Sequence, residues 1–171
     1  PTWVMTSGIA GIECCSMGTA HMAERVGAAM DASDADWAVY VPANRPFVDA
    51  ELVDRLLAIA FESNCDCVGY RSSMDPCPSQ IGLSLTGSSE WQHCDRVEDL
   101  GLTGEVVHAD AVRRLRRNTD RIPMSARANF MDILGVSPGV FHLKLVPLPS
   151  NLDRCDLRFS VDGESDWDRA Q

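Results

Sequence analysis

The segment YVPANRPFVDAELVDRLLAIA (residues 40–60) predicts a strand that ends at a loop and continues as a helix. The run DWAVYV (36–41) is short and apolar, which is typical of a buried strand. Asp49 is a favourable N-cap, and apolar side chains follow it at helical spacing. Asn44 lies between two prolines, at the end of a strand, where α/β proteins bind ligands. An aspartate there would be a metal ligand, whereas an asparagine is a weaker one.

The remaining sequence continues this alternation of strands and helices. Strand, helix and strand joined by short links are typical of βαβ units, which build a parallel sheet. We therefore expect residues 1–171 to form a single α/β domain. The expected helices cover 18–35, 49–62 and 123–139, and a further helix begins near 165. Residues 103–117 are expected to form a strand followed by a helix. The other expected strands cover 1–8, 11–18, 36–41, 65–71, 81–89, 141–149 and 157–161.

Composition restricts the class of protein. The 171 residues, 45% of them hydrophobic, suffice for one domain with a buried core. A net charge of −10 and a pI near 4.7 argue against general binding of nucleic acids or anionic membranes. We interpret the basic cluster RRLRRN (113–118) as the solvent-facing side and end of a helix. No apolar run is long enough to span a bilayer and no signal-peptide pattern opens the chain, so we expect a cytoplasmic protein.

The chain contains seven cysteines, an odd number at irregular spacing. Zinc sites need paired cysteines or a cysteine–histidine cluster at ligand spacing, and the sequence has neither. We therefore expect free thiols, as in a reducing cytoplasm.

Four segments occur in a familiar order. VPANRPFVDAELVDRL (41–56) resembles the motif GDxPfvdpelid, and GLTGEVVHADAVRRL (101–115) resembles GldvEvfsaeaL. The segment over 127–170, which contains RANFMDI and DLRFSVDGESD, resembles a motif that begins REH and ends RltVDtpeD. GIECCSMGTAHMAERV (11–26) has a weaker similarity to sGTdRiaEv. These motifs belong to the sugar-activating cytidylyltransferases, which include CMP-sugar synthetases and the related spore-coat polysaccharide type.

The resemblance implies a Rossmann-like α/β/α nucleotidyltransferase sandwich with a mostly parallel sheet. Members of this family combine a nucleoside triphosphate with a sugar acid and release pyrophosphate. Such a protein would bind CTP and a sugar acid, form a homodimer through an arm, and serve nucleotide-sugar metabolism for cell-surface polysaccharides. Two aspartates hold Mg²⁺, which bridges the phosphates and makes displacement at the α-phosphorus electrostatically feasible.

By resemblance, the metal positions fall on Asn44 and Asp162. Asn44 stands at the first aspartate and is neutral, while Asp162 keeps the second. The altered site therefore loses one of the two charges that hold Mg²⁺ in the family. Without the resemblance, Asn44 fits a turn and Asp162 fits a helix cap, so these structural roles stay open.

The same resemblance assigns substrate contacts to Glu105, Arg127, Asn129 and His21. Glu105 matches a glutamate that contacts the sugar, although an exposed strand edge is the alternative for it. Arg127 keeps the arginine of the REH turn, whereas Asn129 replaces the histidine of that turn. His21 replaces the arginine of sGTdR.

The Gly-rich loop GSxRlPgK, which cradles the triphosphate in the family, has no counterpart in this sequence. We therefore expect the first nucleotide-binding βα unit to be missing and assign no catalytic residue. Three hypotheses remain open. The chain is a cytidylyltransferase-like domain with impaired or lost catalysis, an active enzyme whose nucleotide loop lies outside this chain, or a non-catalytic dimerisation or interaction domain.

Overall fold

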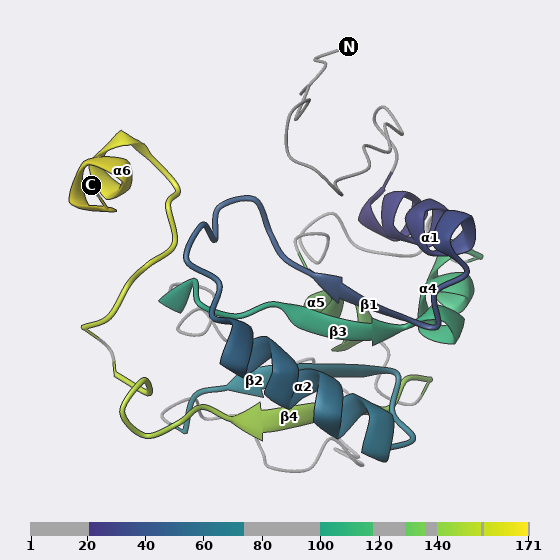
Figure 1. Cartoon of the computed structure of the whole chain (residues 1–171). Helices are drawn as coiled ribbons and strands as arrows, with labels where there is room; N and C mark the ends of the chain where they lie inside the picture. The colour runs from purple at the N-terminus through teal and green to yellow at the C-terminus, as the bar shows by residue number, and fades with distance from the viewer. Residues whose placement is uncertain (1–20, 74–99, 118–128, 136–139, 155, 171) are drawn as a thin grey trace, which may run out of the picture.

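A mixed four-stranded sheet with helices on both faces forms the body of the protein (Figure 1). The computed structural model describes residues 21–73, 100–117, 129–135, 140–154 and 156–170. The expected strands over 1–8, 11–18 and 81–89 lie outside these ranges. The described elements are α1 (Met22–Ser33), β1 (Trp37–Tyr40), α2 (Ala50–Glu62), β2 (Cys67–Arg71), β3 (Glu105–His108), α4 (Ala109–Arg116), α5 (Phe130–Gly135), β4 (Leu143–Pro147) and α6 (Glu164–Ala170).

The sheet has the strand order β1-β3-β2-β4. β3 is antiparallel to both β1 and β2, and only β4 pairs with β2 in parallel. The expectation of a mostly parallel sheet is therefore wrong for the described strands. β1, β2 and β4 do share one direction, as the short strand–helix–strand link predicted, but β3 is inserted between β1 and β2 in the opposite direction. β3 follows β2 only after residues 72–104, and the hydrophobic pattern carries no information on direction across so long a connection.

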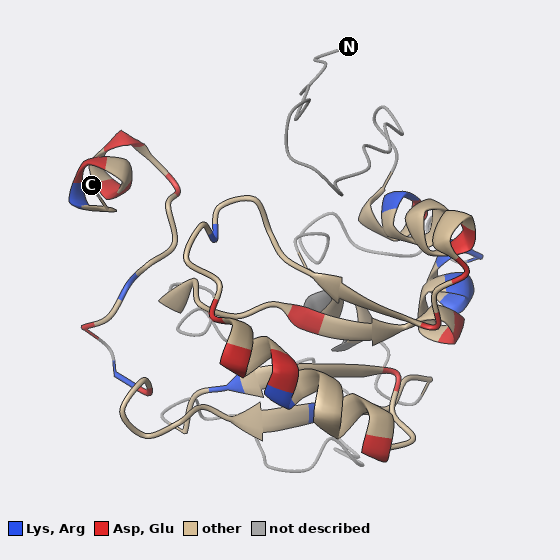
Figure 2. Cartoon of the chain, viewed as in Figure 1, with Lys and Arg blue, Asp and Glu red and all other residues tan. Residues whose placement is uncertain are grey.

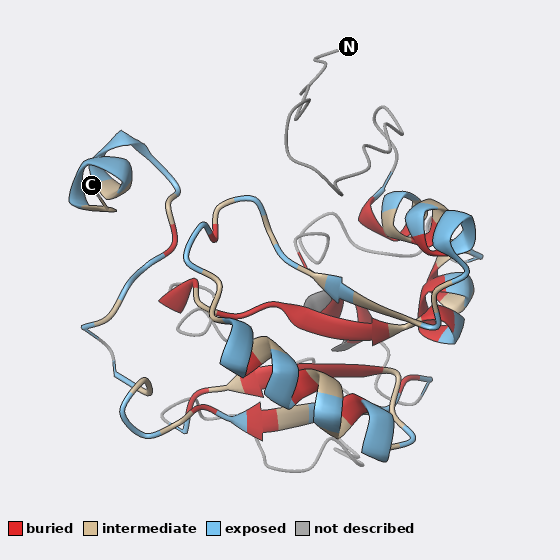
Figure 3. Ribbon diagram, viewed as in Figure 1, coloured by how far each residue is buried: buried red, intermediate tan, exposed pale blue. Residues whose placement is uncertain are grey.

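Alternation along the strands gives the sheet two buried faces. Val68 and Val106 face a cluster built on α2, whereas Cys67 and Val107 face a cluster built on α1, α4 and α5. All four side chains are fully buried, and the buried side of α2 covers the sheet in Figure 3. The described elements thus form the expected three layers, helix, sheet and helix.

Helix ends follow the sequence signals closely. The Asp49 carboxylate accepts hydrogen bonds from the backbone N–H groups of Glu51 and Leu52 at 2.8 and 3.4 Å, which confirms the predicted cap of α2. α4 is capped by His108, whose Nδ1 accepts from the backbone N–H of Asp110 at 3.2 Å. This contact gives His108 a structural role.

The two cysteines that the structure describes, Cys65 and Cys67, are free. Burial, with Glu105 as the next contribution, raises the pKa of the Cys67 thiol well above its ordinary value, so this thiol stays protonated and unreactive. The other five cysteines lie outside the described ranges. None of the described helices is long and apolar enough to cross a membrane.

Candidate functional site

Three separate segments meet where β1 ends and β3 begins. They are the loop after β1 (41–49), the approach to β3 (100–104) and the extended segment 157–163. Backbone bonds join them: Asp49 donates to the Leu102 carbonyl at 2.8 Å, and Phe159 donates to the Leu100 carbonyl at 3.2 Å. The strand predicted over 157–161 is not part of the sheet, and its backbone bonds go to these loops instead.

Asn44 and Asp162 are in direct contact, although 118 positions separate them. The Asn44 side-chain N–H donates to Asp162 Oδ1 at 2.6 Å. The backbone supports the contact, since Val161 N–H donates to the Asn44 carbonyl at 2.8 Å. The structure thus places side by side the two residues that the resemblance assigns to the metal, and their assignment to a metal site stays a prediction.

Hydrogen bonds hold the Asp162 carboxylate in its ionised form. The bond from Asn44 is the largest cause of its lowered pKa. Burial opposes this effect, and Ser160 and Arg158 lower the pKa further. Arg158 reaches Oδ2 at 2.7 Å and Ser160 reaches the same oxygen at 3.0 Å. The backbone N–H of Asp162 donates to Asp166 Oδ2 at 3.1 Å, so the carboxylate of Asp166, and not that of Asp162, bonds back across the start of α6.

Replacement of Asn44 by alanine should raise the pKa of Asp162 toward the ordinary value of an aspartate. Because the pKa of Asp162 is lower in the folded protein than in the unfolded chain, the contact contributes its full stability at a pH above the unfolded pKa. This stability is lost as the pH falls through the folded pKa. A pH titration of the Asp162 carboxyl carbon by NMR measures the shift. Asn151→Ala, in an exposed turn, is the control and should leave the pKa of Asp162 unchanged; an Asp162 titration identical in wild type and Asn44→Ala would contradict this assignment.

The hydrogen bonds of Asp162 occupy the oxygens that Mg²⁺ would need. Both carboxylate oxygens of Asp162 already accept hydrogen bonds, one of them from a guanidinium, and the Asn44 amide turns its N–H toward Asp162. Asn44 Oδ1 is buried and accepts no hydrogen bond from the residues that the structure describes. Mg²⁺ prefers carboxylate oxygens, and no group of three metal-binding side chains occurs in the described part of the chain. The native pair therefore does not fit a resident Mg²⁺.

Glu105 lies at the start of β3, close to this site, but its side chain is inside the protein. It pairs with Tyr40 across β1 and β3, is 7% exposed, and lies on a central strand, so the alternative of an exposed strand edge is wrong. Its carboxylate accepts hydrogen bonds from the backbone N–H groups of Phe130 and Met131 at 2.7 and 3.3 Å. Glu105 thus caps α5, and Asn129, which directly precedes the two capped residues, is also buried.

The remaining sequence-assigned contacts are more scattered. His21 is exposed directly before α1 and forms no side-chain cap for that helix. Arg127 lies outside the described residues. The structure therefore brings together Asn44 with Asp162 and Glu105 with Asn129, and a substrate role for any of the four remains a prediction.

Arg45 is a residue of this site that the sequence did not single out. It is 7% exposed, and its Nη1 donates to the Thr103 carbonyl at 2.7 Å. The Nε of Arg45 is buried without a hydrogen-bond partner among the described residues. A buried arginine is rare because its charge is costly to desolvate, so Arg45 is as unusual a feature of this site as Asn44 is. The only signal in the sequence was its position inside the ANRP turn.

Comparison with known proteins supports the fold. The chain is similar to a solved structure of a cytidylyltransferase from Leptospira borgpetersenii serovar Hardjo-bovis, with a TM-score of 0.58 and 12% sequence identity. The similarity covers 86% of this chain and 52% of that protein, so the chain spans about half the length of its structural neighbour. No protein-family model matches the sequence, and no curated protein matches it. The described residues thus have a mixed α/β fold similar to that of a cytidylyltransferase.

Proposed function

We propose that this chain is a nucleotidyltransferase-like domain of nucleotide-sugar metabolism whose metal-dependent catalysis is impaired or lost. The observation that carries the proposal is the contact between Asn44 and Asp162 at 2.6 Å. Two side chains so far apart in the sequence, at the edge of a cytidylyltransferase-like fold, meet at the pair of positions that the sequence motifs assign to the metal. In this chain an amide N–H takes the place that a cation would need between two oxygens.

One unbalanced positive charge beside the pair supports binding of an anionic ligand. Arg45 is buried next to Asn44 with its Nε unused, whereas the charge of Arg158 is balanced by Asp162 and Asp166. Arginine is well suited to phosphate oxygens because its guanidinium offers several donors in a fixed plane. A nucleotide phosphate and the carboxylate of a sugar acid both have this chemistry, so weak binding of CTP or of a sugar acid fits the site better than turnover does.

A pyrophosphate assay tests the catalytic part of the proposal. With CTP, a sugar acid such as 3-deoxy-manno-octulosonate and Mg²⁺, the wild-type chain should release pyrophosphate no faster than background. Asn44→Asp should not restore turnover, because one restored ligand does not supply a cradle that positions the triphosphate for attack.

Two results would contradict the proposal. Mg²⁺-dependent turnover that disappears in Asp162→Ala would mean that the site is catalytically competent. The other result is that neither CTP nor the sugar acid binds in calorimetry, and that the wild type and Arg45→Gln give the same result. This result would favour the non-catalytic interaction domain, the third hypothesis from the sequence.

A further inference from the structure

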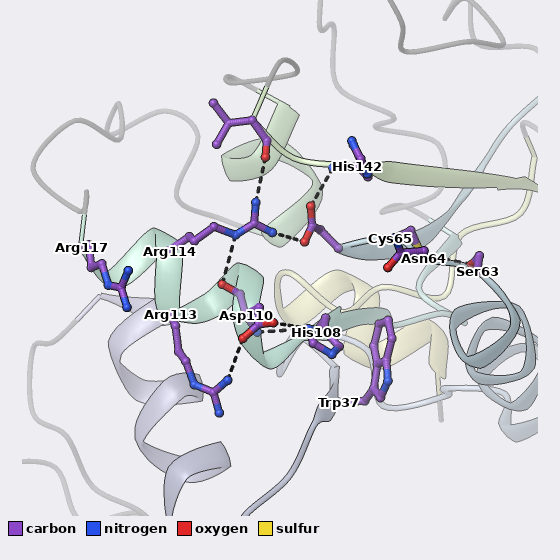
Figure 4. A pocket seen from close by; sticks show the side chains of 12 residues that line it. Trp37, Ser63, Asn64, Cys65, His108, Asp110, Arg113, Arg114, Arg117 and His142 are labelled. Carbon is purple, nitrogen blue, oxygen red and sulfur yellow. Dashed lines mark hydrogen bonds and ion pairs between the residues drawn. The ribbon is translucent and has the colours of Figure 1, made fainter.

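A cavity that the proposed function does not use lies at the opposite ends of the strands. In the register of β1 and β3, Trp37 pairs with His108 at one end and Tyr40 pairs with Glu105 at the other. The site of Asn44 lies at the Glu105 end. The cavity lies at the Trp37 end, has a volume of about 470 Å³, and is bordered by the starts of β1, β2 and β4 and by α4 (Figure 4).

One wall of the cavity is held rigidly by Arg114. Its guanidinium donates to the Val140 carbonyl at 2.8 Å, forms an ion pair with Asp66, and lies 4.8 Å from the centre of the Phe141 ring. The second oxygen of Asp66 accepts from the backbone N–H of His142 at 2.8 Å. Arg114 and Asp66 therefore neutralise each other and fix the walls of the cavity, leaving ligand binding to other groups.

The remaining charge in the cavity is positive. Arg113 pairs with Asp110 at 2.8 Å within α4, but the two side chains are 51% and 65% exposed, so water weakens the pair and a ligand can displace it. Arg117 lines the same cavity and forms no ion pair with any other residue in the described ranges. Arg116, by contrast, is bound to Glu24 and Asp31 of α1. In a chain of net charge −10, this concentration of arginine on α4 is unusual (Figure 2).

Neutral groups line the rest of the cavity. His108 Nδ1 accepts the N–H of Asp110, which leaves the other ring nitrogen of His108 as a donor. The Trp37 ring packs edge-on against His108, with ring centres 4.7 Å apart, and provides an apolar surface. The volume of the cavity is within the range of small-molecule sites, and its lining is mainly polar, which suits a small charged ligand.

We propose that this cavity binds a small phosphate-bearing molecule, with its phosphate between Arg113 and Arg117 and the rest of the molecule along Trp37. A phosphate dianion can accept from two guanidinium groups at once, so it gains more from the pair than a single carboxylate does. The basic cluster on α4 then has a role beyond that of a solvated helix face. The site is separate from Asn44 and Asp162, so each proposal can fail without the other.

NMR titrations of the complete ¹⁵N-labelled chain test the proposal. Inorganic phosphate, CMP and succinate are added in turn, and the indole N–H signals of the four tryptophans are followed, with Trp37 assigned through Trp37→Phe. Phosphate and CMP should shift the Trp37 signal. CMP binding more tightly than phosphate would identify a phosphate ester as the ligand, and equal binding would identify the free anion.

Charge variants locate the site. The double variant Arg113→Gln with Arg117→Gln should weaken the binding detected at Trp37 by about tenfold or more, as expected for the loss of two charge-assisted contacts. Arg169→Gln, on α6 at the far side of the molecule in Figure 1, removes the same kind of charge and should have no effect. An unmoved Trp37 signal, unchanged affinity in the double variant, equal weakening in Arg169→Gln, or succinate binding as tightly as phosphate would each overturn the proposal.

Discussion

Glu105→Ala should destabilise the protein by about 3 kcal/mol, because the substitution leaves two backbone N–H groups without their charged acceptor. Those groups belong to Phe130 and Met131 at the start of α5, and Glu105 itself is 7% exposed. Phe130 is fully buried and packs edge-on against Tyr40, so α5 cannot move toward water to satisfy the lost bonds. Urea denaturation, followed by circular dichroism, measures the change in the free energy of unfolding.

Two variants complete the test of Glu105. Glu105→Gln keeps one acceptor oxygen and should cost less than half as much as alanine does. Glu62→Ala deletes the same kind of side chain at an exposed position, the end of α2, and should be close to neutral. Equal, small effects of Glu105→Ala and Glu62→Ala would show that the carboxylate of Glu105 does not hold α5.

Gly101→Ala should cost about 3 kcal/mol as well, for a reason in the backbone. Gly101 has φ +67°, a conformation that costs residues with a Cβ about 1–2 kcal/mol. A Cβ at this position would also meet the backbone of the 157–163 segment, at 2.6 Å from the Phe159 carbonyl carbon and closer still to Ser160 N. The substitution would force apart the segments that present Asn44 and Asp162.

Gly163→Ala is the matched control, because a Cβ there would have no atom within 4 Å. Its free energy of unfolding should remain within about 0.5 kcal/mol of the wild-type value. In Gly101→Ala the NMR signals of Asn44 and Asp162 should shift along with the loss of stability. A Gly101→Ala protein as stable as Gly163→Ala would contradict the close backbone approach described here.

Local signals in the sequence predicted the local structure well. The Asp49 cap and the apolar spacing after it located α2 to within one residue, because both signals act within a single helix. The insertion of β3 between β1 and β2 was not predictable in this way. It depends on long-range pairing, for which no turn or spacing signal exists in the sequence.

The candidate site shows the same division. The resemblance of sequence motifs led to Asn44 and Asp162, and the structure places their side chains in contact. The resemblance did not reveal that Glu105 caps α5 or that Arg45 is buried with an unused Nε. Both facts arise from burial of the 100–105 segment between other elements, and burial of a single charged residue cannot be inferred from its neighbours in the sequence.

A Mg²⁺ titration of wild type and Asn44→Asp tests most directly whether this contact replaces a metal site. Asn44→Asp brings a second carboxylate to the Asp162 carboxylate, and a hard dication prefers two carboxylates to a carboxylate and an amide. Calorimetry should show Mg²⁺ binding at least about tenfold tighter in Asn44→Asp than in wild type, and no such gain in the control Asn151→Asp. Equal Mg²⁺ affinity in wild type, Asn44→Asp and Asn151→Asp would mean that Asn44 and Asp162 do not lie at the position of a metal site.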